Sequence, residues 1–208
     1  MNRLYFINFF LHIFFGSYAF ASTNDTMPNA YHLKIQDKTT EYLQDWAKSD
    51  SNELADLLTI IPDLKMELFY ATKNNFTKTK LYPDTKTTYL RKSAAIALTK
   101  VQETLKQQGL ALKIWDAYRP YSVTLMMWDL IHDSRYVADP AKGSGHNRGI
   151  AVDLTIINLK DGKELNMGTS FDNFTDSAHH SFTGFSQEVL NNRSLLKKLM
   201  TENGFKII

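Results

Sequence analysis

The chain has 208 residues, of which 43% are hydrophobic and 22% are charged, and it contains no Cys. This length and composition are typical of one globular domain and exclude a disordered or fibrous chain. The 24 basic and 22 acidic residues nearly balance, so we expect neither nucleic acid nor an anionic membrane as a partner. Without Cys, any metal ion must be held by His, Asp or Glu.

The N-terminus has the pattern of a secretory signal peptide. Arg3 precedes a mostly apolar run over residues 4–15, and Ala-Phe-Ala at 19–21 forms a small-residue cleavage site. The run is shorter than the roughly 20 apolar residues that a bilayer requires. We therefore predict a signal peptide over residues 1–21, export to a bacterial periplasm, and no membrane span after cleavage.

The first part of the mature chain is polar. Residues 22–56 are expected to form an N-terminal arm with one short helix near 42–47. Residues 57–61 are rich in β-branched and leucine side chains and end at Pro62, which favours a strand or an extended segment. A second strand is expected over residues 66–70.

The clearest helix covers residues 93–108. Its apolar side chains recur at spacings of four, three and four, and Gly109 follows at the position where a helix often ends. The other predicted elements are a strand at 110–117, a helix at 122–132, a loop at 133–149, a strand at 150–157, a helix at 192–202 and a strand at 205–208. This order predicts a single α+β domain over residues 57–208, with a mixed or antiparallel sheet and helices packed on one side.

Two polar residues in the stretch 144–153 are candidate metal ligands. Asp153 lies between Val152 and Leu154 in a predicted strand, where a carboxylate is costly unless it is paired, hydrogen-bonded or bound to a metal. His146 precedes it in a loop rich in Gly and Ser, and imidazole with carboxylate is a ligand pair that zinc accepts. By spacing alone, a loop-anchoring Asp and a surface His remain the simpler interpretation.

A second candidate is Arg119, which follows a predicted strand and immediately precedes Pro120. The fixed backbone can direct the guanidinium into a cleft, where it would hold a carboxylate or a developing oxyanion. The alternative is a structural pair between Arg119 and Asp116 that locks the turn, and the residues alone favour it.

Taken together, these motifs resemble those of a known family. They are Trp-Asp-Ala-Tyr-Arg-Pro at 115–120, Ser-x-His-x-x-Gly-x-Ala-x-Asp at 144–153, and Met-Gly-x-x-Phe-Asp at 167–172 followed by His-His at 179–180. The combination is similar to the D-alanyl-D-alanine dipeptidases, zinc metallopeptidases of the vancomycin-resistance type that also act in peptidoglycan turnover. The resemblance extends from about Leu57 to the last residue.

The resemblance implies a zinc ion and a zwitterionic dipeptide, D-Ala-D-Ala, as substrate. His146 and Asp153 would be two of three protein ligands to one zinc ion, and Arg119 would stabilise the oxyanion. Tyr70 and Asp172 match positions that hold the ammonium group of the substrate. Recognition of both charged ends would exclude longer peptides.

Further residues are implied by the same family pattern. Ser144 matches a position near the carboxylate of the substrate. The third zinc ligand and the general-base Glu normally come from a Glu-x-x-His motif after the last helix, and residues 205–208 contain none. We therefore expect both groups to be missing from these 208 residues, so that the domain is incomplete at its C-terminus. His179 and His180 do not replace them, because the family has this pair in addition to its full ligand set.

Two alternatives to dipeptide hydrolysis remain open. One is a zinc D,D- or L,D-carboxypeptidase acting on peptidoglycan stem peptides, because the Ser-x-His-x6-Asp core belongs to a wider group of enzymes. The other is a catalytically inactive remnant that still binds D-Ala termini, which the missing Glu-x-x-His would favour.

Overall fold

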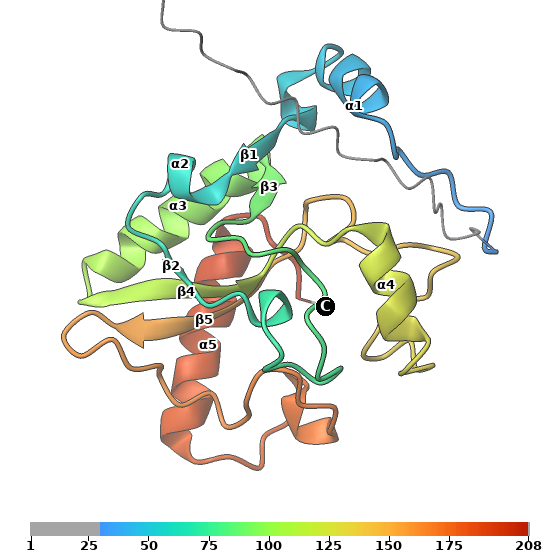
Figure 1. Cartoon of the computed structure of the whole chain (residues 1–208). Helices are drawn as coiled ribbons and strands as arrows, with labels where there is room; N and C mark the ends of the chain where they lie inside the picture. Colours follow the sequence, from blue (N-terminus) through green and yellow to red (C-terminus); the bar gives the residue numbers. More distant parts are fainter. Residues whose placement is uncertain (1–29, 208) are drawn as a thin grey trace, which may run out of the picture.

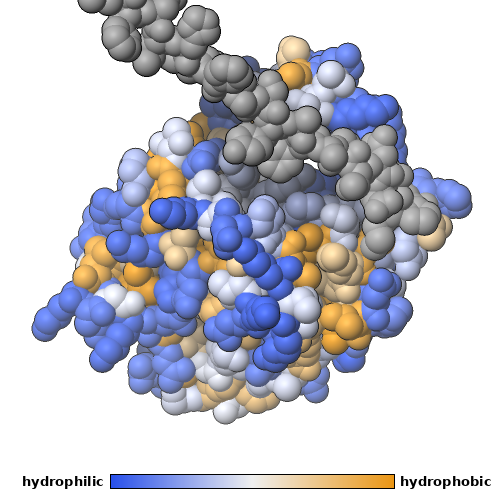
Figure 2. All heavy atoms as spheres, viewed as in Figure 1, coloured by the Kyte–Doolittle hydropathy of each residue, from blue (hydrophilic) through white to orange (hydrophobic). Residues whose placement is uncertain are grey.

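The computed structural model describes residues 30–207, and the predicted signal peptide over residues 1–21 lies outside them (Figure 1). Within residues 30–207, two small sheets and five α-helices form an α+β fold, which confirms the predicted fold class. No helix in this described part is long and apolar enough to cross a membrane. On the face seen in Figure 2, apolar side chains occur in separate patches among polar ones.

The larger sheet has the strand order β2-β4-β5. The central strand β4 (Leu110–Asp116) is parallel to the short β2 (Lys65–Met66) and antiparallel to β5 (Asp153–Asn158). An irregularity in the register follows Ile114, so that Asp116 pairs with Asp153. Two carboxylate residues therefore lie opposite each other at one end of the sheet.

Two long helices contribute to the main core. In α3 (Lys92–Lys106), Leu98, Val101 and Leu105 have no exposed surface, as the apolar spacing predicts. The other helix, α5 (Gln187–Glu202), passes behind β4 and β5 in Figure 1 and contributes Leu199 to the same core. It begins five residues earlier than expected, because the Ser186 hydroxyl accepts a hydrogen bond from the Val189 amide.

The smaller sheet joins β1 (Leu54–Asp56) to β3 (Tyr89–Arg91) in antiparallel fashion. Part of the segment expected to form a polar arm therefore pairs with the domain. The arm also contains α1 (Thr39–Trp46) and the 3₁₀ helix η1 (Asp50–Asn52). These elements lie along the upper part of the molecule in Figure 1.

The strand expected at 57–61 is wrong. The segment forms the short helix α2 (Leu57–Ile60), because the Asp56 carboxylate accepts hydrogen bonds from the amides of Leu58 and Thr59 at 2.8 and 3.1 Å. The strand expected at 66–70 stops at Met66, and the chain turns into η2 (Phe69–Ala71). That turn carries Tyr70 into the interior.

Three later elements differ in extent from the predictions. The helix expected at 122–132 is α4 (Tyr121–Trp128). The strand expected at 150–157 begins only at Asp153, because the Ile150 amide bonds to the Gly145 carbonyl and closes a loop. A short 3₁₀ helix, η3 (Asp176–Ala178), follows in the segment before α5.

The predicted C-terminal strand is not formed by the described residues 205–207. The chain reverses at Gly204, where φ is 89°, and the Phe205 amide bonds to the Met200 carbonyl. This closing bond ends α5 and leaves the segment irregular.

Candidate active site

All six predicted site residues line one cavity of about 1120 Å³. They come from η2, the turn after β4, the loop before β5, the start of β5 and the segment before α5. They are Tyr70, Arg119, Ser144, His146, Asp153 and Asp172. The fold therefore brings together residues that are up to 102 positions apart in the chain.

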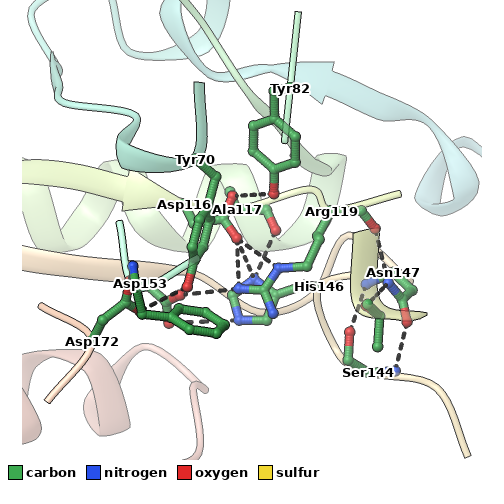
Figure 3. A network of polar contacts seen from close by, with 12 residues as sticks. Tyr70, Tyr82, Asp116, Ala117, Arg119, Ser144, His146, Asn147, Asp153 and Asp172 are labelled. Atoms are coloured by element: carbon green, nitrogen blue, oxygen red, sulfur yellow. Dashed lines mark hydrogen bonds and ion pairs between the residues drawn. The ribbon is translucent and has the colours of Figure 1, made fainter. Parts of the chain in front are cut away.

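The imidazole of His146 is held in one orientation (Figure 3). Its Nδ1 atom lies 2.8 Å from the carbonyl oxygen of Ala117, which can only accept a hydrogen bond. Nδ1 therefore carries a proton, and Nε2, which has a free lone pair when the imidazole is neutral, lies 3.5 Å from Oδ1 of Asp153. A backbone carbonyl on one ring nitrogen is the usual support of a metal-binding His.

Electrostatics couple His146 to Asp153. Burial opposes protonation of His146, but the Asp153 and Asp116 carboxylates outweigh it and raise the pKa of the imidazole. Burial likewise opposes ionisation of Asp153, yet the neighbouring His146 and Arg119 lower the pKa of its carboxyl. An ionised carboxylate beside an imidazole is a suitable pair of donors for a divalent cation.

Asp116 is a third potential ligand, and its oxygens are already engaged. Ligand atoms of Asp116, His146 and Asp153 lie within 4.8 Å of one another. Oδ1 of Asp116 accepts a hydrogen bond from the Tyr82 hydroxyl at 2.8 Å, and Oδ2 accepts two from Arg119. The Asp116 side chain has no exposed surface, whereas 35% of the Asp153 side chain is exposed. The chemistry of His146 and Asp153 thus fits two ligands of a zinc ion. Asp116 instead accepts hydrogen bonds from Arg119.

Arg119 forms the structural pair with Asp116 and also lines the cavity. Its Nε and Nη2 atoms donate to Oδ2 of Asp116 at 3.0 and 2.7 Å, so the structural pair exists. Its guanidinium also lines the cavity, with Nη2 3.5 Å from Oδ2 of Asp153 and its central carbon 5.1 Å from the Tyr70 ring centroid. The pair with Asp116 holds the guanidinium so that it faces the cavity (Figure 3).

Asn147 joins the two loops that carry these groups. Its Nδ2 atom donates to the Arg119 carbonyl and to the Thr124 hydroxyl, both at 2.9 Å. Its Oδ1 atom accepts from the Ser144 amide at 2.9 Å, and its own amide donates to the Ser144 hydroxyl at 3.1 Å. Ser144 is consequently fixed at the cavity wall beside His146.

Tyr70, which is buried, and Asp172, which is partly exposed, form a polar pair elsewhere on the cavity wall. The Tyr70 hydroxyl donates to Oδ1 of Asp172 at 2.7 Å, and the Phe76 amide donates to Oδ2 at 3.3 Å. Asp172 has φ of 56°, a left-handed conformation that is uncommon outside Gly. Burial raises the pKa of its carboxyl, although both hydrogen bonds act in the opposite direction.

Two supporting residues were not predicted as part of the site. They are Tyr82 and Asn147. Asp116 was predicted only as the structural partner of Arg119, and the structure confirms that pair. His179 and His180 also line the cavity, and the His179 ring lies 6.0 Å from the Tyr136 ring centroid.

Comparison with known proteins identifies the family. The family model for peptidase M15, described as D-ala-D-ala dipeptidase, matches residues 50–208. The chain belongs to this family. It is 40% identical over 157 residues to the D-alanyl-D-alanine dipeptidase of Escherichia coli strain K12, covering 76% of this chain and 80% of that protein.

Two further relatives carry the same name. The D-alanyl-D-alanine dipeptidase of Enterococcus faecium is 31% identical over 169 residues, which cover 71% of this chain and 82% of that protein. The corresponding protein of Enterococcus faecalis is 30% identical over 133 residues, covering 55% and 66% respectively. The similarity includes the part of the chain in which the cavity lies.

Proposed function

We propose that this protein is a zinc-dependent dipeptidase that hydrolyses D-Ala-D-Ala in peptidoglycan metabolism. One observation supports this most directly. A single cavity contains a His–Asp pair suited to a metal ion, an oriented guanidinium and a hydrogen-bonded Tyr–Asp pair. The relatives named D-alanyl-D-alanine dipeptidase support the same substrate.

His146 and Asp153 are the residues that would hold the zinc ion. In the neutral imidazole, Nε2 of His146 has a free lone pair for the metal because Nδ1 donates to the Ala117 carbonyl. When bound, zinc supplies Lewis-acid catalysis at the scissile peptide bond. The 208 residues contain no Glu-x-x-His, so we assign the general base to none of them.

The remaining groups would recognise the dipeptide and stabilise the charge that develops during hydrolysis. Arg119, fixed by Asp116, donates to the carbonyl oxygen as it becomes negative, and such prearranged donors lower the barrier. Asp172 accepts from the substrate ammonium, with Tyr70 orienting the carboxylate. Ser144 would lie nearest the carboxylate of the substrate. A site that recognises both the ammonium and the carboxylate of its substrate selects a dipeptide over a longer chain.

Zinc content and product release together test this function. The full chain is supplied with zinc and D-Ala-D-Ala, and free D-alanine is measured over time. We expect release by the wild-type chain, which requires a general base other than the glutamate of a Glu-x-x-His motif, and loss of both bound zinc and release in His146→Ala and Asp153→Ala. His132→Ala, which changes an exposed histidine on a different segment, is the matched control and should retain both. Unchanged zinc content in His146→Ala would disprove the metal site.

A longer substrate distinguishes the alternatives. A stem peptide ending in D-Ala-D-Ala should not be cleaved, because Asp172 and Tyr70 would close the amino side of the cavity. Cleavage of that peptide would instead identify a carboxypeptidase. Calorimetric binding of D-Ala-D-Ala without release of D-alanine would show that the chain binds the ligand and does not hydrolyse it.

We also propose that residues 1–21 direct the protein to the periplasm. The positive residue, the apolar run and the Ala-Phe-Ala site support this. Cell fractionation should recover a product beginning at Ser22, identified by mass spectrometry, in the periplasmic fraction. Recovery of the uncleaved chain in the cytoplasm would contradict the proposal.

A further inference from the structure

Arg193 of α5 is the centre of a hydrogen-bond cluster outside the six site residues. Its side chain donates from three nitrogen atoms to four acceptors in the segment that precedes α5. These are the Met167 carbonyl at 2.7 Å, the Ser177 carbonyl at 3.0 Å, the His179 carbonyl at 3.1 Å and the Thr169 hydroxyl at 3.4 Å. The guanidinium carbon also lies 4.4 Å from the ring centroid of Phe185.

The acceptors lie on both sides of Asp172 in the sequence. Two of them, at 167 and 169, precede it, and two, at 177 and 179, follow it. Arg193 therefore ties together the two arms of the loop that carries Asp172. Asn192 adds one hydrogen bond to this loop, from its side chain to the Asn166 carbonyl at 3.0 Å.

Asp172 is a residue whose conformation needs such support. Its φ of 56° is sparsely populated by residues with a side chain, and strained conformations persist only where the surroundings hold them. Its carboxylate accepts hydrogen bonds from Tyr70 and Phe76, and both donors come from the distant segment around η2. If the loop were held only at Asp172, movement of the residues on either side, 167–169 and 177–179, would disturb this geometry.

The chemistry of this cluster requires an arginine. A guanidinium offers five N–H donors in a rigid planar fork, and here four acceptors surround it. A lysine has three donors on one atom and cannot bond to the acceptors at 167 and 169 and those at 177 and 179 with the same geometry. Within residues 30–207, no carboxylate forms an ion pair with Arg193, so its charge is used for the loop and the Phe185 ring.

We infer that Arg193 is a positioning residue that fixes the Asp172 loop and thereby sets the affinity of the site for the substrate ammonium. The inference rests on the proposed dipeptidase function, and it assigns to α5 a role in substrate recognition. Arg193 does not line the cavity. It acts through the loop that it holds.

The first test measures the loop without any need for activity. Backbone hydrogen exchange over residues 167–179 is compared in the wild-type chain and in Arg193→Lys. We expect the exchange of this segment to accelerate about tenfold or more. Lysine keeps the positive charge but lacks the planar set of guanidinium donors that bonds to the loop. The strands β4 and β5 should exchange as before. Unchanged exchange in the loop would overturn the inference.

The second test measures the substrate effect. For D-Ala-D-Ala, Arg193→Lys should raise KM about tenfold with a smaller change in kcat, since a misplaced carboxylate weakens recognition of the ammonium. In an Asp172→Asn background the same substitution should have little further effect on KM, because the two residues act on one contact. Equal effects in both backgrounds would show a merely structural role and overturn the inference.

Two further variants keep these tests decisive. Lys198→Gln removes a charge from an exposed position on the same helix and should change neither loop exchange nor KM. If Arg193→Lys does not fold, Asn192→Ala removes the single bond to Asn166 and should accelerate loop exchange to a smaller extent. No acceleration would count against the inference. If the wild-type chain releases no D-alanine, the dipeptidase proposal fails, and the exchange measurement still decides whether Arg193 holds the loop.

Discussion

The hydroxyl of Tyr70 donates a hydrogen bond of 2.7 Å to Oδ1 of Asp172, and the two residues are 102 positions apart in the sequence. This contact joins the η2 turn to the loop before α5. Tyr70 is buried, with only 3% of its surface exposed, and Asp172 is partly exposed. Hydrogen bonds to a charged group are stronger than neutral ones, so this pair fixes the carboxylate at the cavity wall.

Replacing Tyr70 with Phe removes only the hydroxyl that orients Asp172. We expect KM for D-Ala-D-Ala to rise about tenfold, because a hydrogen bond to a charged group contributes about 1.5–3 kcal/mol. The value of kcat should change less, since Arg119 and the metal ligands are untouched. Steady-state kinetics on the purified variant measure both constants. A loss confined to kcat would contradict a role in binding the ammonium group.

The carboxyl of Asp172 predicts a stability effect that depends on pH. Burial raises the pKa of this carboxyl above its ordinary value of 3.8, so the carboxyl ionises at a lower pH in the unfolded chain than in the folded one. The stability associated with the neutral form is fully present below the unfolded pKa and is lost as pH rises through the folded pKa. Asp172→Asn does not ionise, and Asn tolerates a left-handed backbone well.

The melting temperature of Asp172→Asn should therefore increase relative to the wild-type chain as pH rises from acid to neutral. Differential scanning calorimetry at a series of pH values gives this difference directly. The same variant should bind D-Ala-D-Ala more weakly at neutral pH, since it lacks the negative charge. A difference in melting temperature that does not vary with pH would show that Asp172 is not destabilised by ionisation.

Arg119→Lys separates positive charge from guanidinium geometry. Arg119 makes two hydrogen bonds to Oδ2 of the fully buried Asp116, and lysine can supply only a single charged donor atom. We expect kcat to fall by about 10²–10³, as is typical when an oriented oxyanion donor is lost. Circular dichroism should show that the variant folds. A normal kcat would show that Arg119 does not stabilise the oxyanion and only forms the structural pair with Asp116.

The parts of the fold that could be predicted are those with a strong local pattern. The helix α3 follows from its apolar spacing, and β4 follows from a mostly apolar run. The composition of residues 57–61 predicts a strand, whereas the carboxylate of Asp56 caps the segment as the helix α2. The helix α5 begins five residues before the predicted start, and the sequence signal for this start is the cap at Ser186.

For the site, the sequence supplied the residue types, and the three-dimensional fold supplies their arrangement. His146 and Asp153 are seven positions apart, and their pairing follows from one loop and one strand. The partnership of Asp116 with Tyr82 depends on packing across 34 positions and has no sequence pattern. The predicted pair between Arg119 and Asp116 is confirmed, and it leaves the guanidinium lining the cavity, where the proposed oxyanion role remains a prediction.

The core between α3 and the sheet gives a prediction that is independent of activity. Leu98 has no exposed surface and belongs to the main core, whereas Ile96 on the same helix is 49% exposed. Leu98→Ala should lower the free energy of unfolding by about 2–5 kcal/mol, because it removes buried methyl groups and leaves a cavity. Ile96→Ala should change it by about 0.5 kcal/mol or less. Urea denaturation followed by circular dichroism measures both values, and equal losses at the two positions would contradict the packing of α3 described above.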